Sequence, residues 1–202
     1  MSAEQVDQPR AEARRAQILC AAADCFRAHG FHGASIAQIS RAAGMSAGHI
    51  YHYFENKEAI IAAIVARDLE RLLTLTAEMR SACNVKEAML ECVATGVEDN
   101  LDPRYAGLNL EIVAEASRNA RVAEIVRNAD RACRESLAVT LSDMRRASGH
   151  EDDDATIAAM VEVLAAMFEG LMCRTIRNPE IDRATVKRLF QGAVRDLLEQ
   201  AS

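Results

Sequence analysis

Apolar residues recur at intervals of three and four positions along most of this chain of 202 residues, which is the spacing of one face of an α-helix. No segment alternates apolar and polar residues for long enough to form a β-strand. The sequence therefore predicts an all-α fold. The expected helices span residues 10–29, 35–44, 46–52, 56–82, 84–100, 104–118, 121–147, 152–177 and 182–200.

Charge is distributed unevenly along the chain. Residues 1–58 carry six Lys and Arg against six Asp and Glu, so the net charge of −6 belongs entirely to residues 59–202. We therefore predict two domains, one at 1–58 with a short flexible N-terminal arm and a larger one at 59–202. An acidic protein is a poor partner for nucleic-acid phosphates, but the neutral segment 1–58 escapes that objection.

Composition excludes several classes of protein. Half of the residues are apolar and only three are proline, which argues against a disordered or collagen-like chain. The longest apolar run, 59–66, is too short to cross a bilayer, and residues 1–15 lack the apolar stretch of a secretory signal. We therefore predict a cytoplasmic protein without a membrane partner. The six cysteines are scattered and are expected to be buried and reduced, and we predict neither a metal site nor a cofactor.

Residues 35–52 have the spacing of a helix-turn-helix. Ser35 and Gln38 are placed to form a capping box at the start of the first helix, and Gly44 permits the left-handed turn that ends it. Ser46 is placed to cap a short second helix. The residues expected to pack the two helices together are Ile39, Ala43 and Ile50.

The second helix of this motif is the predicted recognition helix. Its first residues are small, so its backbone could approach DNA closely, with Ala47 suited to a thymine methyl group and His49 to a base edge. Tyr51 and Lys57 offer donors for phosphate oxygens, whereas Arg41 is either a phosphate contact or a solvated charge. The candidate DNA-binding residues are Ser35, Arg41, Ser46, Ala47, Gly48, His49, Tyr51, His52, Tyr53 and Lys57.

One family pattern runs through residues 14–60, carried by Ile18-Leu19, Ala22, Phe26, Gly30-Phe31, Ser35-Ile36, Ile39, Ala43-Gly44, Ser46, Gly48, Ile50-Tyr51, Tyr53-Phe54 and Lys57-Glu58. With these residues the segment resembles the N-terminal domain of the TetR/AcrR family of transcriptional regulators. The resemblance implies a three-helix DNA-binding domain, followed by a larger helical domain that dimerises and binds an effector. It also implies DNA contacts at Ser35, Ser46, Ala47, Gly48, His49, Tyr51, Tyr53 and Lys57.

The C-terminal part is less explicit. Helices 152–177 and 182–200 carry apolar stripes broad enough to face both their own domain and a second copy of the chain, so we expect a homodimer through them. Glu111 and Glu115 are expected to be solvated, with binding of a cationic ligand as the alternative. Ordinary core packing is the alternative for each candidate lining residue of an apolar effector pocket, namely Met89, Cys92, Tyr105, Leu108, Ile112, Met144, Met167, Phe168 and Met172.

The sequence therefore predicts a ligand-responsive regulator that binds a palindromic operator as a dimer. We expect it to act as a repressor released by a small, apolar molecule, with activation as the alternative outcome of the same binding. Helix 56–82, which joins the two domains, is the expected lever. Two other classes compete: an enzyme on a helical scaffold, for which no convergent nucleophile and base are found by spacing, and a helical ligand carrier without DNA activity.

Overall fold

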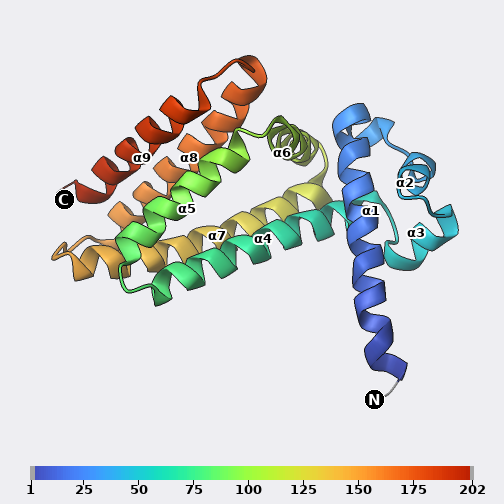
Figure 1. Ribbon diagram of the computed structural model, residues 1–202, viewed down its shortest axis with the longest axis horizontal. Helices are drawn as coiled ribbons and strands as arrows, with labels where there is room; N and C mark the ends of the chain where they lie inside the picture. The colour runs from blue at the N-terminus through green and yellow to red at the C-terminus, as the bar shows by residue number, and fades with distance from the viewer. Residues whose placement is uncertain (1–2, 201–202) are drawn as a thin grey trace. The chain divides into compact units, whose positions relative to one another are not determined.

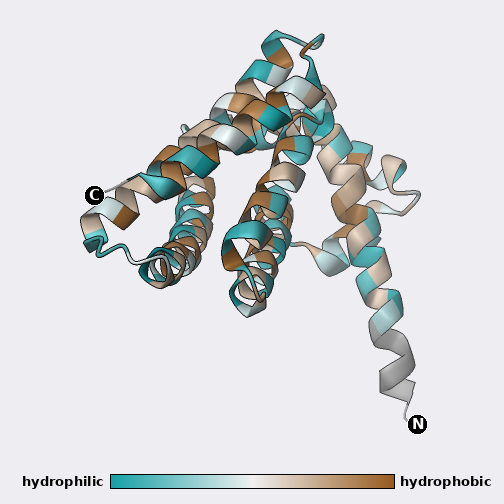
Figure 2. Cartoon of the chain, turned by 60° about the vertical axis from the view of Figure 1, so that its left-hand side comes forward, coloured by the Kyte–Doolittle hydropathy of each residue, from teal (hydrophilic) through white to brown (hydrophobic). Residues whose placement is uncertain are grey.

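The computed structural model describes residues 3–200, and it describes side chains from Pro9 onward. Within that range the chain forms nine α-helices and no β-strand, which confirms the predicted fold class (Figure 1). Bands of hydrophobic and hydrophilic residues alternate along the helices (Figure 2). The helices are α1 (Ala3–Gly33), α2 (Ile36–Ala42), α3 (Ala47–Tyr53), α4 (Lys57–Ser81), α5 (Val85–Asn100), α6 (Pro103–Ala116), α7 (Ala120–Ala147), α8 (Asp154–Arg177) and α9 (Arg183–Glu199).

The first helix differs from its expected bounds at both ends. It begins at Ala3 rather than at residue 10 and contains Pro9, so the segment expected to be a flexible arm is helical where the structure describes it. Gly30, expected to end the helix, kinks it instead, at φ 68° and ψ 167°, and one further turn follows. Glycine adopts this conformation without the steric cost that a side chain would impose at positive φ.

The described residues pack into two compact units. The first unit comprises the residues up to Arg67 together with Glu111–Val126, and the second comprises Asp68–Leu110 together with the residues from Arg127 onward. The whole of 1–58 belongs to the first unit, which also contains the end of α6 and the start of α7. Helices α4, α6 and α7 therefore each contribute residues to both units.

The first unit has its core on one face of α1. Ile18, Ala22 and Phe26 lie four positions apart and are buried. α1 contacts α2, and α2 contacts α3. Three residues that the sequence assigned to the packing of the helix-turn-helix are all buried, as predicted: Ile39, Ala43 and Ile50.

The turn between α2 and α3 is set by Gly44, which lies at φ 64°. The amide of Met45 donates to the carbonyl of Ser40 at 2.9 Å, and the amide of Gly44 donates to the carbonyl of Arg41 at 3.2 Å. These two bonds form the Schellman motif that commonly ends a helix. Ser40 is itself buried, which its small side chain allows where the helices approach.

The second unit has an apolar core to which α5, α8 and α9 contribute most, with residues of α4 and α7 added. Phe168 of α8 and Phe190 of α9 lie with their ring centroids 4.9 Å apart. A Cβ at Gly96 of α5 would come within 3.0 Å of the Phe168 ring. Glycine at position 96 therefore leaves room for the Phe168 ring between α5 and α8.

Arg145 is buried near the end of α7 and joins three segments of the second unit. Its guanidinium pairs with Asp152, which lies between α7 and α8. It also donates to the carbonyl of Leu198 at 2.8 Å and to that of Gln200 at 2.9 Å. Because the last carbonyls of a helix have no partner within it, Arg145 satisfies the end of α9 and fixes its position.

Helix α8 is more apolar than its burial within the chain requires. By length and composition alone it could cross a membrane, with a hydropathy of 1.7 over an 18-residue window, yet only 28% of that window is buried. Val163 and Ile176 are exposed on it. The sequence of α8 has no long uninterrupted apolar run, because Glu162 and Glu169 lie within it.

The cysteines depart in part from expectation. Cys25 is buried, but Cys20 and Cys83 are exposed, so the prediction of burial is wrong for those two. All six are free thiols. Burial raises the pKa of the Cys25, Cys92 and Cys133 thiols, with neighbouring carboxylates raising it further. These three thiols are therefore kept protonated, which lowers their reactivity.

Candidate nucleic-acid interface

Helix α3 exposes nearly all of its surface. Of its seven residues only Ile50 is buried, at 0% exposed, and this side chain anchors the helix. Tyr51 is 56% exposed. The predicted contact residues from its N-cap onward are exposed as well: Ser46, Ala47, Gly48, His49 and His52. A helix held by one apolar side chain adds little to the core and leaves most of its surface available to a partner.

Gly48 in α3 has no explanation within the fold. Its φ is not positive, and a Cβ built there would meet no atom within 4 Å. Glycine inside a helix costs about 1 kcal/mol relative to alanine. The missing side chain instead leaves the helix backbone open to close approach from outside.

The remaining candidates lie around α3 in different environments. Tyr53 is half-buried, with the rings of His49 and His52 at centroid distances of 5.4 Å and 5.2 Å. Ser35 and Arg41 are exposed at the two ends of α2. The capping box predicted for Ser35 is present: its hydroxyl accepts from the amide of Gln38 at 3.2 Å, and the Gln38 side chain accepts from the Ser35 amide at 2.8 Å.

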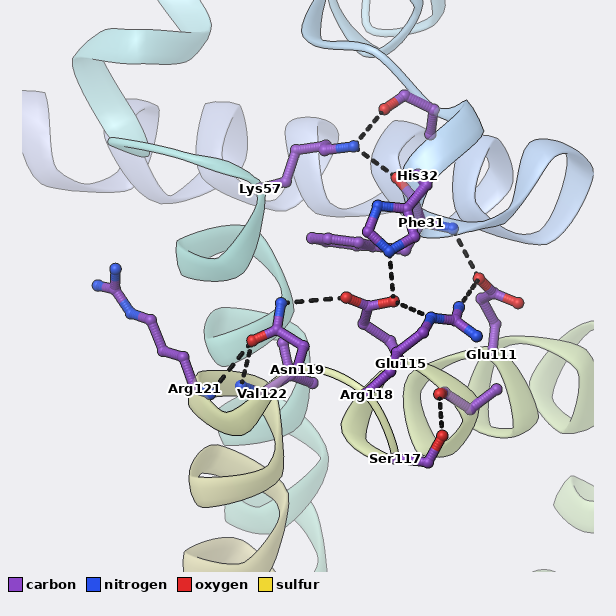
Figure 3. A network of polar contacts seen from close by, with 12 residues as sticks. Phe31, His32, Lys57, Glu111, Glu115, Ser117, Arg118, Asn119, Arg121 and Val122 are labelled. Atoms are coloured by element: carbon purple, nitrogen blue, oxygen red, sulfur yellow. Dashed lines mark hydrogen bonds and ion pairs between the residues drawn. The ribbon is translucent and has the colours of Figure 1, made fainter.

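Lys57, at the start of α4, is turned toward the backbone of the first unit (Figure 3). Its ammonium group donates to the carbonyls of Phe31 at 2.5 Å and Ala34 at 2.9 Å, and lies 4.5 Å from the centre of the Phe31 ring. A lysine ammonium has three donors, and these two carbonyls accept from two of them. The internal role was not predicted, because both carbonyls lie more than twenty residues away in sequence.

Two carboxylates of α6 reach the end of α1, within the first unit (Figure 3). Glu111 Oε1 accepts a hydrogen bond from the backbone amide of Phe31 at 2.6 Å. Glu115 Oε2 lies 3.2 Å from Nε2 of His32. The two acidic side chains thus contact two successive residues that lie just after the kink in α1.

The carboxylate of Glu115 is fully buried, at 0% exposed, and has partners on both oxygens. Arg118 Nε donates to Oε2 at 2.9 Å, and Asn119 Nδ2 donates to Oε1 at 3.0 Å. Arg118 also lies 3.9 Å from Glu111, so one guanidinium serves both carboxylates. A buried charge is tolerated only when it is paired and hydrogen-bonded in this way.

The expectation that both glutamates are solvated is therefore wrong for Glu115, and Glu111 is half-buried. Phe31, the backbone partner of Glu111, lies 80 positions away, a distance across which sequence spacing gives no information. A local signal was present nevertheless. Arg118 and Asn119 follow Glu115 at three and four positions, a spacing that predicts contact on or near one helix face.

The nine candidate effector residues are not all in one place. Met89 and Met144 belong to the core of the second unit, and Cys92, Met167 and Phe168 pack against that core. Ile112 belongs to the first unit, whereas the other eight belong to the second. Leu108 is buried and Met172 is half-buried.

Tyr105 is the polar member of this candidate set. It lies near Arg71, whose Nη1 donates to a carboxylate oxygen of Asp99 at 2.7 Å. Burial raises the pKa of Tyr105, and the carboxylate of Asp68 raises it further, while Arg71 lowers it. The second unit therefore holds a tyrosine hydroxyl that stays neutral near a charged guanidinium.

A surface pocket of about 300 Å³ lies elsewhere in the second unit, where α7 connects to α8. None of the nine candidates lines it. Its lining is mostly polar and charged, and consists of Ser142, Arg146, His150, Glu151, Asp152 and Ile157. This pocket is therefore poorly suited to an apolar effector.

The geometry of the first unit defines a class of protein. A capped helix, a Schellman turn and an exposed second helix on a three-helix core are the parts of a helix-turn-helix DNA-binding domain. Residues 18–64 match the family described as bacterial regulatory proteins of the tetR family, and residues 86–199 match the C-terminal domain of BetI-type transcriptional repressors. The chain belongs to the TetR family of transcriptional regulators.

Individual relatives agree with this assignment. The chain is 31% identical over 165 residues to the HTH-type transcriptional regulator UidR of Escherichia coli strain K12, covering 82% of this chain and 83% of UidR. It is 26% identical over 161 residues to the HTH-type transcriptional repressor AcnR of Corynebacterium jeikeium, covering 80% of each. The solved structure of Salmonella enterica GusR has a TM-score of 0.75 at 29% identity, covering 93% of this chain and 96% of that one.

Membership in this family decides between the competing classes. TetR-family proteins are ligand-binding, DNA-binding transcriptional regulators and not enzymes, so the chain is a regulator rather than an enzyme on a helical scaffold. A carrier without DNA activity is excluded on the same ground. Regulators of this family bind operator DNA and small-molecule effectors, typically as dimers.

Proposed function

We propose that α3 is the recognition helix and that the chain represses transcription by placing α3 in the major groove of a palindromic operator. The exposure of α3 carries this proposal: Ile50 is the one fully buried residue among its seven, and His49 and Tyr51 are exposed to solvent. Gly48 supports it further, since nothing inside the protein requires glycine there. A recognition helix reads base edges with its first residues, which fits Ala47 against a thymine methyl and His49 against a base.

The phosphate contacts in this proposal come from the helix ends and from side chains around α3. Ser35 and Ser46 cap two helix N-termini, where backbone amides attract phosphate oxygens. Tyr51 and the third donor of Lys57 add side-chain contacts, as does Arg41. Because residues 1–58 are neutral overall, we expect few phosphate contacts per subunit.

Dimerisation would supply the remaining affinity. We place the dimer interface on α8 and α9, where Val163, Ile176 and Leu189 are exposed, the last at 59%. A second copy of this surface would complete a four-helix interface around a two-fold axis. This interface would also account for the apolar composition of α8 without any membrane, in keeping with a cytoplasmic regulator.

We assign DNA binding to residues 1–58, and effector binding and dimerisation to 59–202. The effector is a small, mostly apolar molecule, because methionine, leucine and phenylalanine dominate the candidate residues of the second unit. Its binding would favour a conformation with lower operator affinity, with α4 as one connecting helix. A screen for small molecules that release the protein from operator DNA identifies the effector.

Gel shifts with DNA from the upstream region of its own gene test the proposed function. Wild type should bind a discrete site with an affinity that falls steeply with salt. Tyr51→Phe should bind more weakly, and His49→Ala should change the preferred sequence rather than only the affinity. Glu124→Ala, an exposed carboxylate on α7, is the matched control and should bind like wild type. Wild-type affinity and sequence preference in both Tyr51→Phe and His49→Ala would contradict the docking of α3.

A further inference from the structure

The backbone around Phe31 is held from two sides by side chains of other helices. Its amide donates to Glu111 of α6 at 2.6 Å, and its carbonyl accepts from Lys57 of α4 at 2.5 Å (Figure 3). All three residues belong to the first unit. Phe31 lies four residues before Ser35, the N-cap of α2. The segment that leads from α1 into the helix-turn-helix is therefore fixed by α4 and α6 together.

The kink at Gly30 is matched to this contact. In an uninterrupted helix the amide of residue 31 would donate to the carbonyl of residue 27, whereas here it donates to a carboxylate of α6. A Cβ at position 30 would lie 3.1 Å from Glu111 Oε1, so the glycine also makes room for the carboxylate. The kink at Gly30 thus frees the Phe31 amide and leaves space for its acceptor, the Glu111 carboxylate.

Glu111 does not act alone. Arg118 lies 2.9 Å from Glu115 and 3.9 Å from Glu111, and so links the two carboxylates. Glu115 meets His32, the next residue after Phe31, at 3.2 Å. The charged groups around the segment are thus Glu111, Glu115, Arg118 and Lys57, with His32 at the solvent-facing edge.

We propose that Glu111 is a positioning residue for operator binding, supported by Glu115. By holding the Phe31 amide it would fix residues 31–34, and with them the start of α2 and the presentation of α3. The inference rests on the proposed function of α3 and adds the end of α6 to it.

Operator affinity distinguishes a positioning role of Glu111 from an effect of its charge, because the two change the affinity in opposite directions when the carboxylate is removed. Removing a carboxylate makes the protein less acidic, which by itself strengthens binding to a polyanion. Loss of the contact with Phe31 would weaken specific binding instead. A positioning residue also leaves the salt dependence of binding unchanged, since no phosphate contact is removed.

The test compares Glu111→Ala, Glu111→Gln and the control Glu124→Ala in the full-length protein. Amide exchange at Phe31, followed by NMR without DNA, should accelerate by about tenfold in Glu111→Ala, because the hydrogen bond to a charged acceptor is lost. Operator affinity should fall by about tenfold with an unchanged salt slope. Glu111→Gln keeps an acceptor oxygen and should lie between wild type and Glu111→Ala in both measurements. Glu124→Ala should change neither.

Two results would overturn the inference while leaving the proposed function intact. The first is faster exchange at Phe31 with operator affinity equal to that of the control. The second is unchanged exchange at Phe31. If Glu111→Ala does not fold, the glutamine variant decides: wild-type affinity together with altered exchange counts against the proposal, and weakened affinity supports it. Failure of both wild type and Glu124→Ala to bind upstream DNA would instead overturn the proposed function, and this inference with it.

Discussion

Helices α3 and α8 both expose residues that the packing of the chain does not use, but of opposite kinds. α3 exposes His49, Tyr51 and a glycine with open space around it, whereas α8 exposes Val163 and Ile176. Small and polar exposed residues suit a nucleic acid, which is read by hydrogen bonds and close backbone approach. Exposed aliphatic residues suit a second copy of an apolar surface. This difference supports the proposal that α3 recognises the operator and that α8 contributes to the dimer interface.

The distribution of acidic residues along the chain bears on how a dimer would bind DNA. The net charge of −6 lies in residues 59–202, and residues 1–58 are neutral. One subunit thus has little of the basic surface that usually drives DNA affinity. Two subunits held together at α8 and α9 would bind two half-sites at once, and the second contact would benefit from a high effective concentration.

A charge placed on the exposed apolar surface of α8 should have the largest effect on operator binding. Val163→Arg would place a charge in the proposed dimer interface, so we expect monomers by sedimentation and operator affinity lower by on the order of 100-fold. Helicity should be retained, because Val163 is already exposed. Val139→Arg on α7, another exposed valine, should remain dimeric and bind DNA. A dimeric Val163→Arg protein would place the interface elsewhere.

The next largest effects on operator binding are expected at Lys57 and Tyr51, which should differ in their effect on stability. Lys57→Ala should weaken operator binding by about tenfold and reduce the salt slope by about 1, because a phosphate contact is lost. It should also lower the melting temperature of the free protein, since the carbonyls of Phe31 and Ala34 lose their donor. Tyr51→Phe should weaken binding while leaving the melting temperature unchanged. Equal melting temperatures for Lys57→Ala and wild type would contradict the internal role of Lys57.

Gly48→Ala should move stability and binding in opposite directions. Alanine is the better helix former and a Cβ has open space, so the free protein should gain about 0.5–1 kcal/mol of stability. Operator binding should weaken by a smaller factor than in Lys57→Ala, because the methyl group stands between the helix backbone and DNA. Thermal melts and gel shifts on the same preparation measure both. Unchanged operator binding would show that α3 does not need a glycine to approach DNA.

The smallest expected effect concerns the N-caps of α8 and α9. Hydrogen bonds with Thr156 and Thr185 lower the pKa of Asp153 and Asp182, the N-caps of α8 and α9. Because folding depresses these pKa values, their stabilisation is present above the ordinary carboxyl range and is lost as pH falls through the folded-state pKa. Melting curves between neutral pH and pH 3 should therefore depend less on pH in Asp153→Asn. Equal pH dependence in the two proteins would mean that this cap contributes nothing.

The sequence predicted those features of the molecule that depend on neighbours in the chain. Ser35 with Gln38 predicted a capping box, and Gly44 predicted the turn, because each signal lies within one helical turn of its partner. The burial of Ile39 and Ile50 followed from helical spacing in the same way. For these residues local propensity and tertiary packing agree.

Contacts between distant segments could not be predicted in this way. Glu111 and Phe31 lie 80 positions apart, so the acidic residues of α6 read as a solvated face. Lys57 was expected to point only at DNA, because the carbonyls that it binds belong to a helix end more than twenty residues earlier. Both contacts became visible only in the three-dimensional structure, where residues distant in sequence lie side by side.

The central claim, that exposed α3 helices of a dimer read two half-sites, is tested most directly by comparing three DNA fragments. The first is the operator selected from upstream DNA, the second has one half-site scrambled, and the third has an additional five base pairs between the half-sites. We expect symmetric protection with half-site centres about 34 Å, or a multiple of that, apart. We also expect a large loss of affinity for both altered fragments. Equal affinity for all three fragments would contradict the reading of two half-sites by a dimer.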